Sequence, residues 1–114
     1  MALIYKLLSA AAWHEAEAGG TFVGAPVDLA DGYIHFSTAA QVAETAAKHF
    51  AGQRDLLLVA VDPQKLGDAL RWEVSRGGAS FPHLYAPLVT ADASWAKPLP
   101  LDADGHHAFD GLLP

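Results

Sequence analysis

The segment Leu56-Leu57-Leu58-Val59-Ala60-Val61 decides the fold of this chain, because six consecutive apolar residues end there at the turn Asp62-Pro63. An apolar run of this length, bounded by a turn, is typical of a strand that is buried on both faces. We therefore predict that residues 56–61 form a central strand of a sheet.

The residues before this strand predict two helices and several short strands. Ser9 can cap a first helix, which the pair Gly19-Gly20 ends. Thr38 and Gln41 have the spacing of a capping box that opens a second helix. In order, we expect a strand over 3–8, a helix over 10–18, a short strand over 21–23, turns at Pro26 and Asp31-Gly32, a strand over 33–36 and a helix from Thr38 to Phe50.

The residues after the central strand predict a hairpin and a last strand. In order, we expect a strand over 70–74, a turn at Gly77-Gly78, a strand over 81–88 and a strand over 94–97. The first of these alternates, so Arg71 and Glu73 share a polar face. Pro82 and Pro87 cannot donate to a ladder, which indicates an edge or bulged strand.

The order of these elements indicates the α+β class. Strands lie early and late in the chain with one substantial helix between them, unlike the alternation of βαβ units. A chain of 114 residues has the length of one domain. We expect residues 1–101 to form a single compact domain and residues 102–114, which contain several Gly and Asp residues, to be a loosely held tail.

Charge and composition exclude several classes of protein. Seven Lys or Arg against thirteen Asp or Glu give a net charge of −6, so extended nucleic-acid binding is not expected. The absence of cysteine removes disulfides and thiolate metal sites, and adjacent histidines such as His106-His107 seldom converge on one ion. Apolar runs fall well short of the roughly 20 residues of a membrane span. We expect a cytoplasmic protein without a metal site or a membrane partner.

Two strand-like segments each hold a histidine among aromatic residues: Asp31-Gly32-Tyr33-Ile34-His35-Phe36-Ser37-Thr38 and Phe81-Pro82-His83-Leu84-Tyr85-Ala86-Pro87-Leu88. Alternate residues of a strand share a face. Those expected on one face are Tyr33, His35 and Ser37 in the first segment and Phe81, His83 and Tyr85 in the second. Such faces are typical of a small-molecule pocket, and we predict that both imidazoles open into one cleft.

These segments also carry a resemblance to a known family. The residues concerned are Ile4-Tyr5, Trp13, Asp31–Thr38, Gln41-Val42, Leu70–Glu73 and Phe81–Tyr85. In their order and motifs the chain resembles the domain-of-unknown-function 952 family of small bacterial and plant proteins, over roughly residues 3–96. That family has no established activity and is grouped by fold with ADP-ribosyltransferase-like proteins. The resemblance implies a split, mostly antiparallel sheet with two helices and a cleft suited to a nicotinamide dinucleotide or another nucleotide.

The same resemblance implies roles for some residues. Transferases of that fold carry a His or Arg on the first strand, a Ser or Tyr with Thr on a middle strand, and a Glu late in the chain. Here Lys6 stands in the first place, Ser37-Thr38 in the second and Glu73 in the third. Because an ammonium only donates hydrogen bonds, Lys6 would bind a ribose or an amide differently from a histidine.

The hypothesis that follows is a small protein that binds a nucleotide or an NAD-like anionic molecule and acts as a transferase. Glu73 and His35 are the candidate catalytic residues. The candidate ligand-binding residues are His83, Tyr85, Ser37, Thr38, Arg71 and Lys6. Structural alternatives are helix capping for the Ser-Thr pair and a solvated ion pair for Arg71 and Glu73. The alternative function is a non-catalytic interaction or regulatory module that uses the same face.

Overall fold

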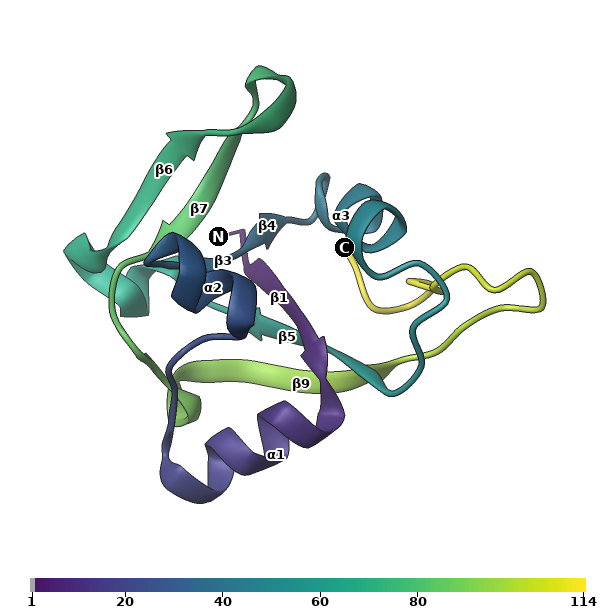
Figure 1. Cartoon of the computed structure of the whole chain (residues 1–114), viewed down its shortest axis with the longest axis horizontal. Helices are drawn as coiled ribbons and strands as arrows, with labels where there is room; N and C mark the ends of the chain where they lie inside the picture. Colours follow the sequence, from purple (N-terminus) through teal and green to yellow (C-terminus); the bar gives the residue numbers. More distant parts are fainter. Residues whose placement is uncertain (1) are drawn as a thin grey trace.

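The computed structural model describes residues 2–114, apart from the side chain of Arg76, and places the predicted central strand inside an antiparallel sheet (Figure 1). The strands of this sheet are, in order, β4 (Ser37–Thr38), β1 (Ile4–Ser9), β5 (Leu56–Val61) and β9 (Ala93–Leu99). Every residue of β5 is buried. The prediction of a central strand buried on both faces is therefore confirmed.

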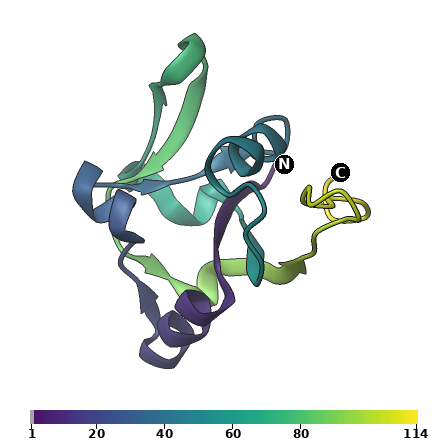
Figure 2. The same ribbon diagram turned by 45° about the vertical axis from the view of Figure 1, so that its right-hand side comes forward.

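The two faces of this sheet carry separate parts of the core. Figure 2 shows the first helix (purple) at the bottom of the view and the later helix (dark teal) in its upper half. The odd-numbered residues of β5 pack in one cluster with Trp13 of helix α1 (Ala10–Gly19). The even-numbered residues pack in another cluster with Val42 and Ala46 of helix α3 (Val42–His49). The alternation of side chains along one apolar strand thus builds a core on both of its faces.

Helix α1 begins and ends as the sequence predicts. The Ser9 hydroxyl accepts a hydrogen bond from the Ala12 N–H at 3.1 Å, which satisfies one of the free donors of the first turn. Gly20 closes the helix in the left-handed conformation, with φ of +89°. Helix α3 begins later than predicted, since Thr38 is held in β4 by its pairing with Ile4.

Residues 26–31 form a helix, although the sequence pattern predicts only turns there. This helix, α2 (Pro26–Asp31), has proline in its first turn and ends at Gly32 with φ of +88°. Both features are ordinary signals of a helix start and end, but six residues are too few to show helical periodicity. The described part of the chain therefore contains three α-helices instead of two.

A second antiparallel sheet carries the histidine segments. Its strands are, in order, β3 (Ile34–His35), β7 (Ser80–Leu84) and β6 (Leu70–Val74). The expectation that Pro82 marks an edge or bulged strand is wrong, because β7 lies between β3 and β6 and pairs with both in a regular register. Pro82 is tolerated there because β3 ends beside it: the Pro82 carbonyl accepts a hydrogen bond from the Phe36 N–H at 3.0 Å, and the chain then leaves this sheet.

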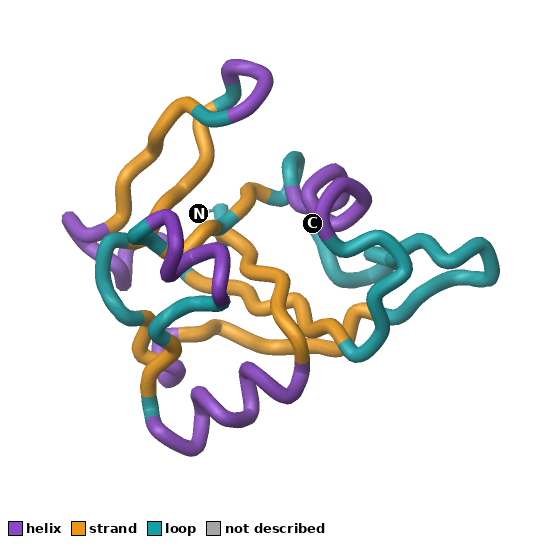
Figure 3. Tube along the Cα trace, in the orientation of Figure 1, coloured by secondary structure: helices purple, strands orange, loops and turns teal. Residues whose placement is uncertain are grey.

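The remaining elements are a third sheet of two short strands and three 3-10 helices (Figure 3). They are β2 (Thr21–Phe22), which pairs with β8 (Leu88–Val89), and the 3-10 helices η1 (Pro63–Ala69), η2 (Arg76–Gly78) and η3 (Thr90–Asp92). The segment from β3 to β4 runs directly from the second sheet into the first. The fold is thus an α+β arrangement of antiparallel sheets. None of the helices among residues 2–114 combines the length and the apolar character that crossing a membrane requires.

The C-terminal residues are held more closely than expected for a loose tail. Leu101 and His107 form an isolated β-bridge across a turn. Phe109, Leu112 and Leu113 pack against the α3 side of the core. Burial of these apolar side chains accounts for the difference from the expectation, which rested on the polar residues of the turn alone.

Candidate functional site

The candidate site lies where α2, β3, β6 and β7 meet. The pairing of β3 with β7 sets His35 directly opposite His83, and the pairing of β6 with β7 sets Arg71 on the other side of His83. The ring centroids of the two histidines are 5.6 Å apart. Two segments that are distant in sequence therefore bring their imidazoles side by side.

A buried carboxylate, Asp28, anchors the first of these histidines. Its side chain is 1% exposed and accepts hydrogen bonds from the Nζ of Lys6 at 2.9 Å and the Nδ1 of His35 at 2.6 Å. The backbone N–H groups of Ala25 and His35 donate to it as well. Burial raises the pKa of Asp28, but the His35 bond and the Lys6 ammonium outweigh burial and lower this pKa to about 2.

The other ring nitrogen of His35 faces a second carboxylate. Its Nε2 lies 2.9 Å from an Oδ2 of Asp31, at the exposed end of α2. A carboxylate only accepts hydrogen bonds, so a neutral imidazole can satisfy one of these two contacts and an imidazolium can satisfy both. His35 is thus held at both nitrogens, although its side chain is 32% exposed.

The second histidine is oriented by Glu73. The Nδ1 of His83 donates to Glu73 Oε1 at 2.8 Å, and the Tyr85 hydroxyl donates to the same oxygen at 2.7 Å. These two bonds, with the Tyr85 bond the larger influence, lower the pKa of Glu73. A proton held on Nδ1 leaves the Nε2 of His83 as an acceptor. Among the described residues, this Nε2 has no hydrogen-bond partner. Every fully buried side-chain nitrogen or oxygen atom of the described residues has a partner, so the Nε2 of His83 must be accessible to solvent.

Tyr33 joins the two histidines into one aromatic cluster. Its ring stacks on His83 with centroids 4.1 Å apart and contacts His35 at 4.7 Å and Tyr85 at 5.2 Å. Burial and the negative charges of Asp31 and Glu73 raise the pKa of Tyr33, so its hydroxyl stays protonated at neutral pH. The cluster is defined by Tyr33, His35, Glu73, His83 and Tyr85.

A pocket of about 250 Å³ adjoins this cluster. Tyr33 and Tyr85 line one part of it, and the rest is lined mostly by apolar residues such as Leu29, together with Asp28 and Gly32. Neither imidazole is part of its wall, so a ligand in the pocket contacts the histidines at its edge or through the tyrosine rings. The guanidinium of Arg71 lies 5.1 Å from the Tyr85 ring, on the β6 side.

Some residues predicted for the site lie elsewhere. Lys6 is buried and paired with Asp28, so its Nζ does not reach an open surface where the predicted contact with a ligand could form. Ser37 is buried in β4, where its hydroxyl lies 3.1 Å from that of Thr45 in α3. Thr38 follows it in β4, and its N–H donates to the Gln41 side chain. The turn of the chain at Phe36 separates both residues from the face of His35.

Two residues of the site, Asp28 and Asp31, were not among the predicted ones, whereas Tyr33 was expected on the face of His35 but was not named as a ligand-binding residue. Asp28 stands at the third position of α2, two residues after Pro26. Proline followed by an acidic residue in the first turn is a known signal of a helix start, and recognising it would have predicted α2 and its carboxylates. Nothing in the sequence alone relates Asp28 to Lys6, which lies 22 positions away.

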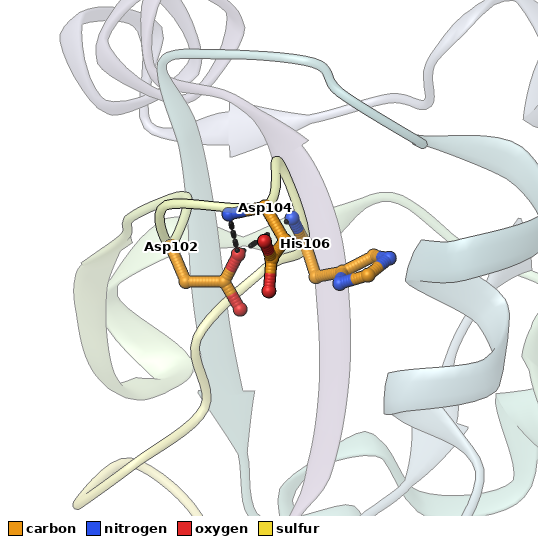
Figure 4. Close-up of side chains that lie close together, drawn as sticks. All are labelled: Asp102, Asp104 and His106. Atoms are coloured by element: carbon orange, nitrogen blue, oxygen red, sulfur yellow. Dashed lines mark hydrogen bonds between the residues drawn. The ribbon is translucent and has the colours of Figure 1, made fainter.

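Within the described residues, a group of potential metal ligands lies in the C-terminal turn (Figure 4). The ligand atoms of Asp102, Asp104 and His106 lie within 4.8 Å of one another, and all three residues are exposed. Asp102 Oδ1 accepts hydrogen bonds from the backbone N–H groups of the other two, which accounts for the shape of this turn. The group is remote in sequence from the aromatic cluster and shares no residue with it.

Comparison with known proteins gives one family and one well-matched relative. A family model described as "Protein of unknown function (DUF952)" matches residues 7–96. None of the curated proteins matches the chain. A crystal structure of protein CC0527 from Caulobacter crescentus is 54% identical, covers 94% of each chain and superposes with a TM-score of 0.91. A solution NMR structure of CC0527 is 54% identical with a TM-score of 0.87, covering 96% of this chain and 94% of the other.

Proposed function

The chain belongs to the DUF952 family of proteins of unknown function, and we propose that it binds a small planar molecule beside Tyr33 and Tyr85 and acts on it as a transferase. The observation that carries this proposal is the Glu73–His83 pair, whose hydrogen bond leaves a proton-accepting nitrogen next to a stacked tyrosine. A carboxylate that fixes one nitrogen of a histidine is a recurrent way to prepare the other nitrogen for acid–base work.

The size of the pocket limits the ligand. Ligand pockets commonly measure roughly 300 to 1,000 Å³, and the pocket here, of about 250 Å³, is smaller. It has room for one aromatic ring such as nicotinamide or a nucleobase, with any ribose and phosphates outside. The tyrosine rings and apolar walls suit such a ring, because offset stacking and burial both favour it.

Charge determines which part of an NAD-like ligand contributes to binding. Arg71 is the cation beside the cluster, while Asp31 and Glu73 are carboxylates near it. Lys6 is neutralised by Asp28. The surroundings therefore favour the ring of NAD over its pyrophosphate, and free phosphate-rich ligands are expected to bind more weakly.

The proposed chemistry is transfer of a ribosyl group, as in proteins of the ADP-ribosyltransferase-like fold. The glycosidic bond to nicotinamide breaks while a bond forms to the oxygen of an acceptor hydroxyl. His83 Nε2 takes the proton that this hydroxyl loses, and nicotinamide leaves with the electron pair of the broken bond. Glu73 then acts as the group that orients His83, since hydrogen bonds already hold it as a carboxylate.

Calorimetric titration with nicotinamide, NAD, ADP-ribose and adenosine tests the binding. We expect nicotinamide and NAD to bind. Adenosine and ADP-ribose carry adenine but lack the nicotinamide ring, so they measure how well the pocket accepts a nucleobase, and ADP-ribose should bind more weakly than adenosine because its phosphates lie near Asp31 and Glu73. Tyr85→Ala should remove the binding. His49→Ala should not, because His49 is exposed at the end of α3, which packs on the central sheet and does not line the pocket. Absence of binding to all four compounds at millimolar concentration would overturn the proposal. Binding without release of nicotinamide would restrict it to a binding protein.

A further inference from the structure

No other strand of the described structure pairs with the outer edge of β6, where the N–H of its first residue, Leu70, already donates to the Gly67 carbonyl. The strand order β3-β7-β6 leaves β6 at the border of its sheet. Figure 1 shows the β6–β7 hairpin standing away from the rest of the molecule. An unpaired strand edge presents N–H and C=O groups that can pair with another strand.

The proline of β7 establishes which groups of β6 point outward. Trp72 lies opposite Pro82, which has no N–H and whose carbonyl is bonded to Phe36 on the β3 side. In an antiparallel strand, the N–H and the C=O of one residue point to the same side. Pro82 therefore faces β3, and the N–H and C=O of Trp72 face away from β7, toward the open edge. By alternation the same holds for Val74.

The same residues expose apolar side chains. Trp72 is 51% exposed and Val74 is 73% exposed, on the face opposite to Arg71 and Glu73. Both residues are on the part of the hairpin that extends beyond the buried Leu84. A tryptophan and a valine exposed together on an unpaired edge are a frequent mark of an interaction surface.

The sequence of β6 is complementary to itself. If two copies of Leu70-Arg71-Trp72-Glu73-Val74 pair in antiparallel fashion about Trp72, each Arg71 lies opposite a Glu73 and each Leu70 lies opposite a Val74. Opposite charges and apolar side chains that meet directly across strands stabilise a sheet. We propose that β6 is the interface of a symmetric dimer formed with a second copy of this chain.

In this dimer the two Trp72 residues exchange backbone hydrogen bonds, and each Val74 N–H donates to the Leu70 carbonyl of the partner subunit. Leu70 needs no further acceptor, because its own N–H already donates to Gly67. The six strands then form one continuous sheet with an isologous interface. A second copy is favoured over an unrelated strand because antiparallel self-pairing about Trp72 sets both Arg71 and Glu73 of each copy opposite their counter-charges.

The dimer adds a residue to the candidate site. Glu73 accepts hydrogen bonds from His83 and Tyr85 with one oxygen, Oε1. Arg71 of the partner subunit would lie directly across from Glu73 on the same face, within reach of its other oxygen. The orientation of His83 would then depend on a charge supplied by the second copy.

Sedimentation velocity over micromolar to millimolar concentrations tests this proposal. We expect the wild-type chain to form dimers and Arg71→Glu to weaken the dimer at least tenfold. Glu73→Arg should weaken it as well, by placing arginines opposite each other. An equimolar mixture of these two variants should associate again, because each charge then meets its opposite. Lys97→Glu, which changes the net charge equally on exposed β9, is the matched control and should leave dimerisation unchanged.

Two further variants distinguish a loss of dimerisation from a loss of folding. Trp72→Lys should give a folded monomer, while Val89→Lys, at another exposed apolar position, should give a wild-type dimer. Circular dichroism verifies that each variant is folded. A wild-type chain that stays monomeric at millimolar concentration, or a dimer that the charge variants do not affect, would overturn the proposal. So would a mixture of the charge variants that fails to associate.

Discussion

The two histidine–carboxylate pairs of the site are built in opposite ways. In the Asp28–His35 pair the carboxylate is buried, at 1% exposure, and the imidazole is 32% exposed. In the Glu73–His83 pair the imidazole is buried, at 5% exposure, and the carboxylate is 38% exposed. Both pairs use Nδ1, at 2.6 and 2.8 Å respectively. The position of the charge relative to solvent, and not the bond itself, distinguishes them.

This difference assigns separate tasks to the two pairs. A buried carboxylate must be matched by donors, and Asp28 has them from β1, from β3 and from the loop before α2. It therefore joins elements of both sheets, and removing it affects the fold. An exposed carboxylate such as Glu73 can lose a partner at little cost in folding free energy. Its removal is expected to affect the orientation of His83 first.

The largest effect is expected from Asp28→Asn. This change leaves the Lys6 ammonium buried without a counter-charge and should lower the free energy of unfolding by about 3–5 kcal/mol. Urea unfolding followed by tryptophan fluorescence measures it. Asp31→Asn, which removes the exposed partner of the same histidine, is the control and should have a small effect. Equal losses in both variants would contradict the assignment of Asp28 as the structural anchor.

Acid should weaken the fold through the same residue. The pKa of Asp28 is lowered from 3.8 to about 2 in the folded chain, so the folded state binds fewer protons than the unfolded state between these values. The resulting stabilisation is present above pH 3.8 and is lost as the pH falls toward 2. It amounts to about 2 kcal/mol. Carbon-detected NMR of the Asp28 carboxyl checks the pKa directly, and a titration near the ordinary value would refute the prediction.

Glu73→Gln tests the exposed carboxylate of the second pair. We expect its urea midpoint to stay near the wild-type value and well above that of Asp28→Asn, since Glu73 is partly exposed. The His83 ring should nevertheless lose its fixed orientation, which two-dimensional NMR of the ring nitrogens detects as a change of tautomer population. A loss of stability as large as that of Asp28→Asn would mean that Glu73 also holds the fold together, and would contradict the separate tasks of the two carboxylates.

The smallest effect concerns the Tyr85 hydroxyl. The hydrogen bond to Glu73, followed by burial, raises the pKa of Tyr85. Glu73→Gln should therefore lower this pKa toward its ordinary value. Absorbance titration of the phenolate measures the shift, and Tyr85→Phe identifies which transition belongs to this residue. An unchanged titration in Glu73→Gln would show that the bond does not persist in solution.

The elements with strong periodicity were predictable from the sequence, and the short ones were not. The strand at 56–61 and the Ser9-capped helix follow from local pattern alone, and both are confirmed. Helix α2 was missed because a segment of six residues shows less than two turns of periodicity. The middle position of β7 depends on where β3 ends, which is a property of the pairing and not of Pro82 by itself.

The candidate site follows the same rule. Alternation correctly relates Tyr33 to His35 on one face, and the pairing of two separate strands then brings His83 beside them. Ser37 was expected on that face as well, but the chain changes sheet at Phe36, and no local pattern indicates such a change. The partnership of Lys6 with Asp28 depends on tertiary packing, so it became visible only in the structure.

The apolar strand at the centre of the molecule also bears on how this chain leaves the ribosome. Leu56–Val61 contains neither charge nor proline, and such six-residue segments readily aggregate when they are exposed. During synthesis β1 is already available to pair with one edge of β5, whereas the other edge of β5 stays unpaired until β9 has been synthesised. Asp55 and Asp62 border the segment, and their charges oppose aggregation until β9 pairs with β5. We expect a nascent chain that stops before residue 93 to be insoluble and to need a chaperone.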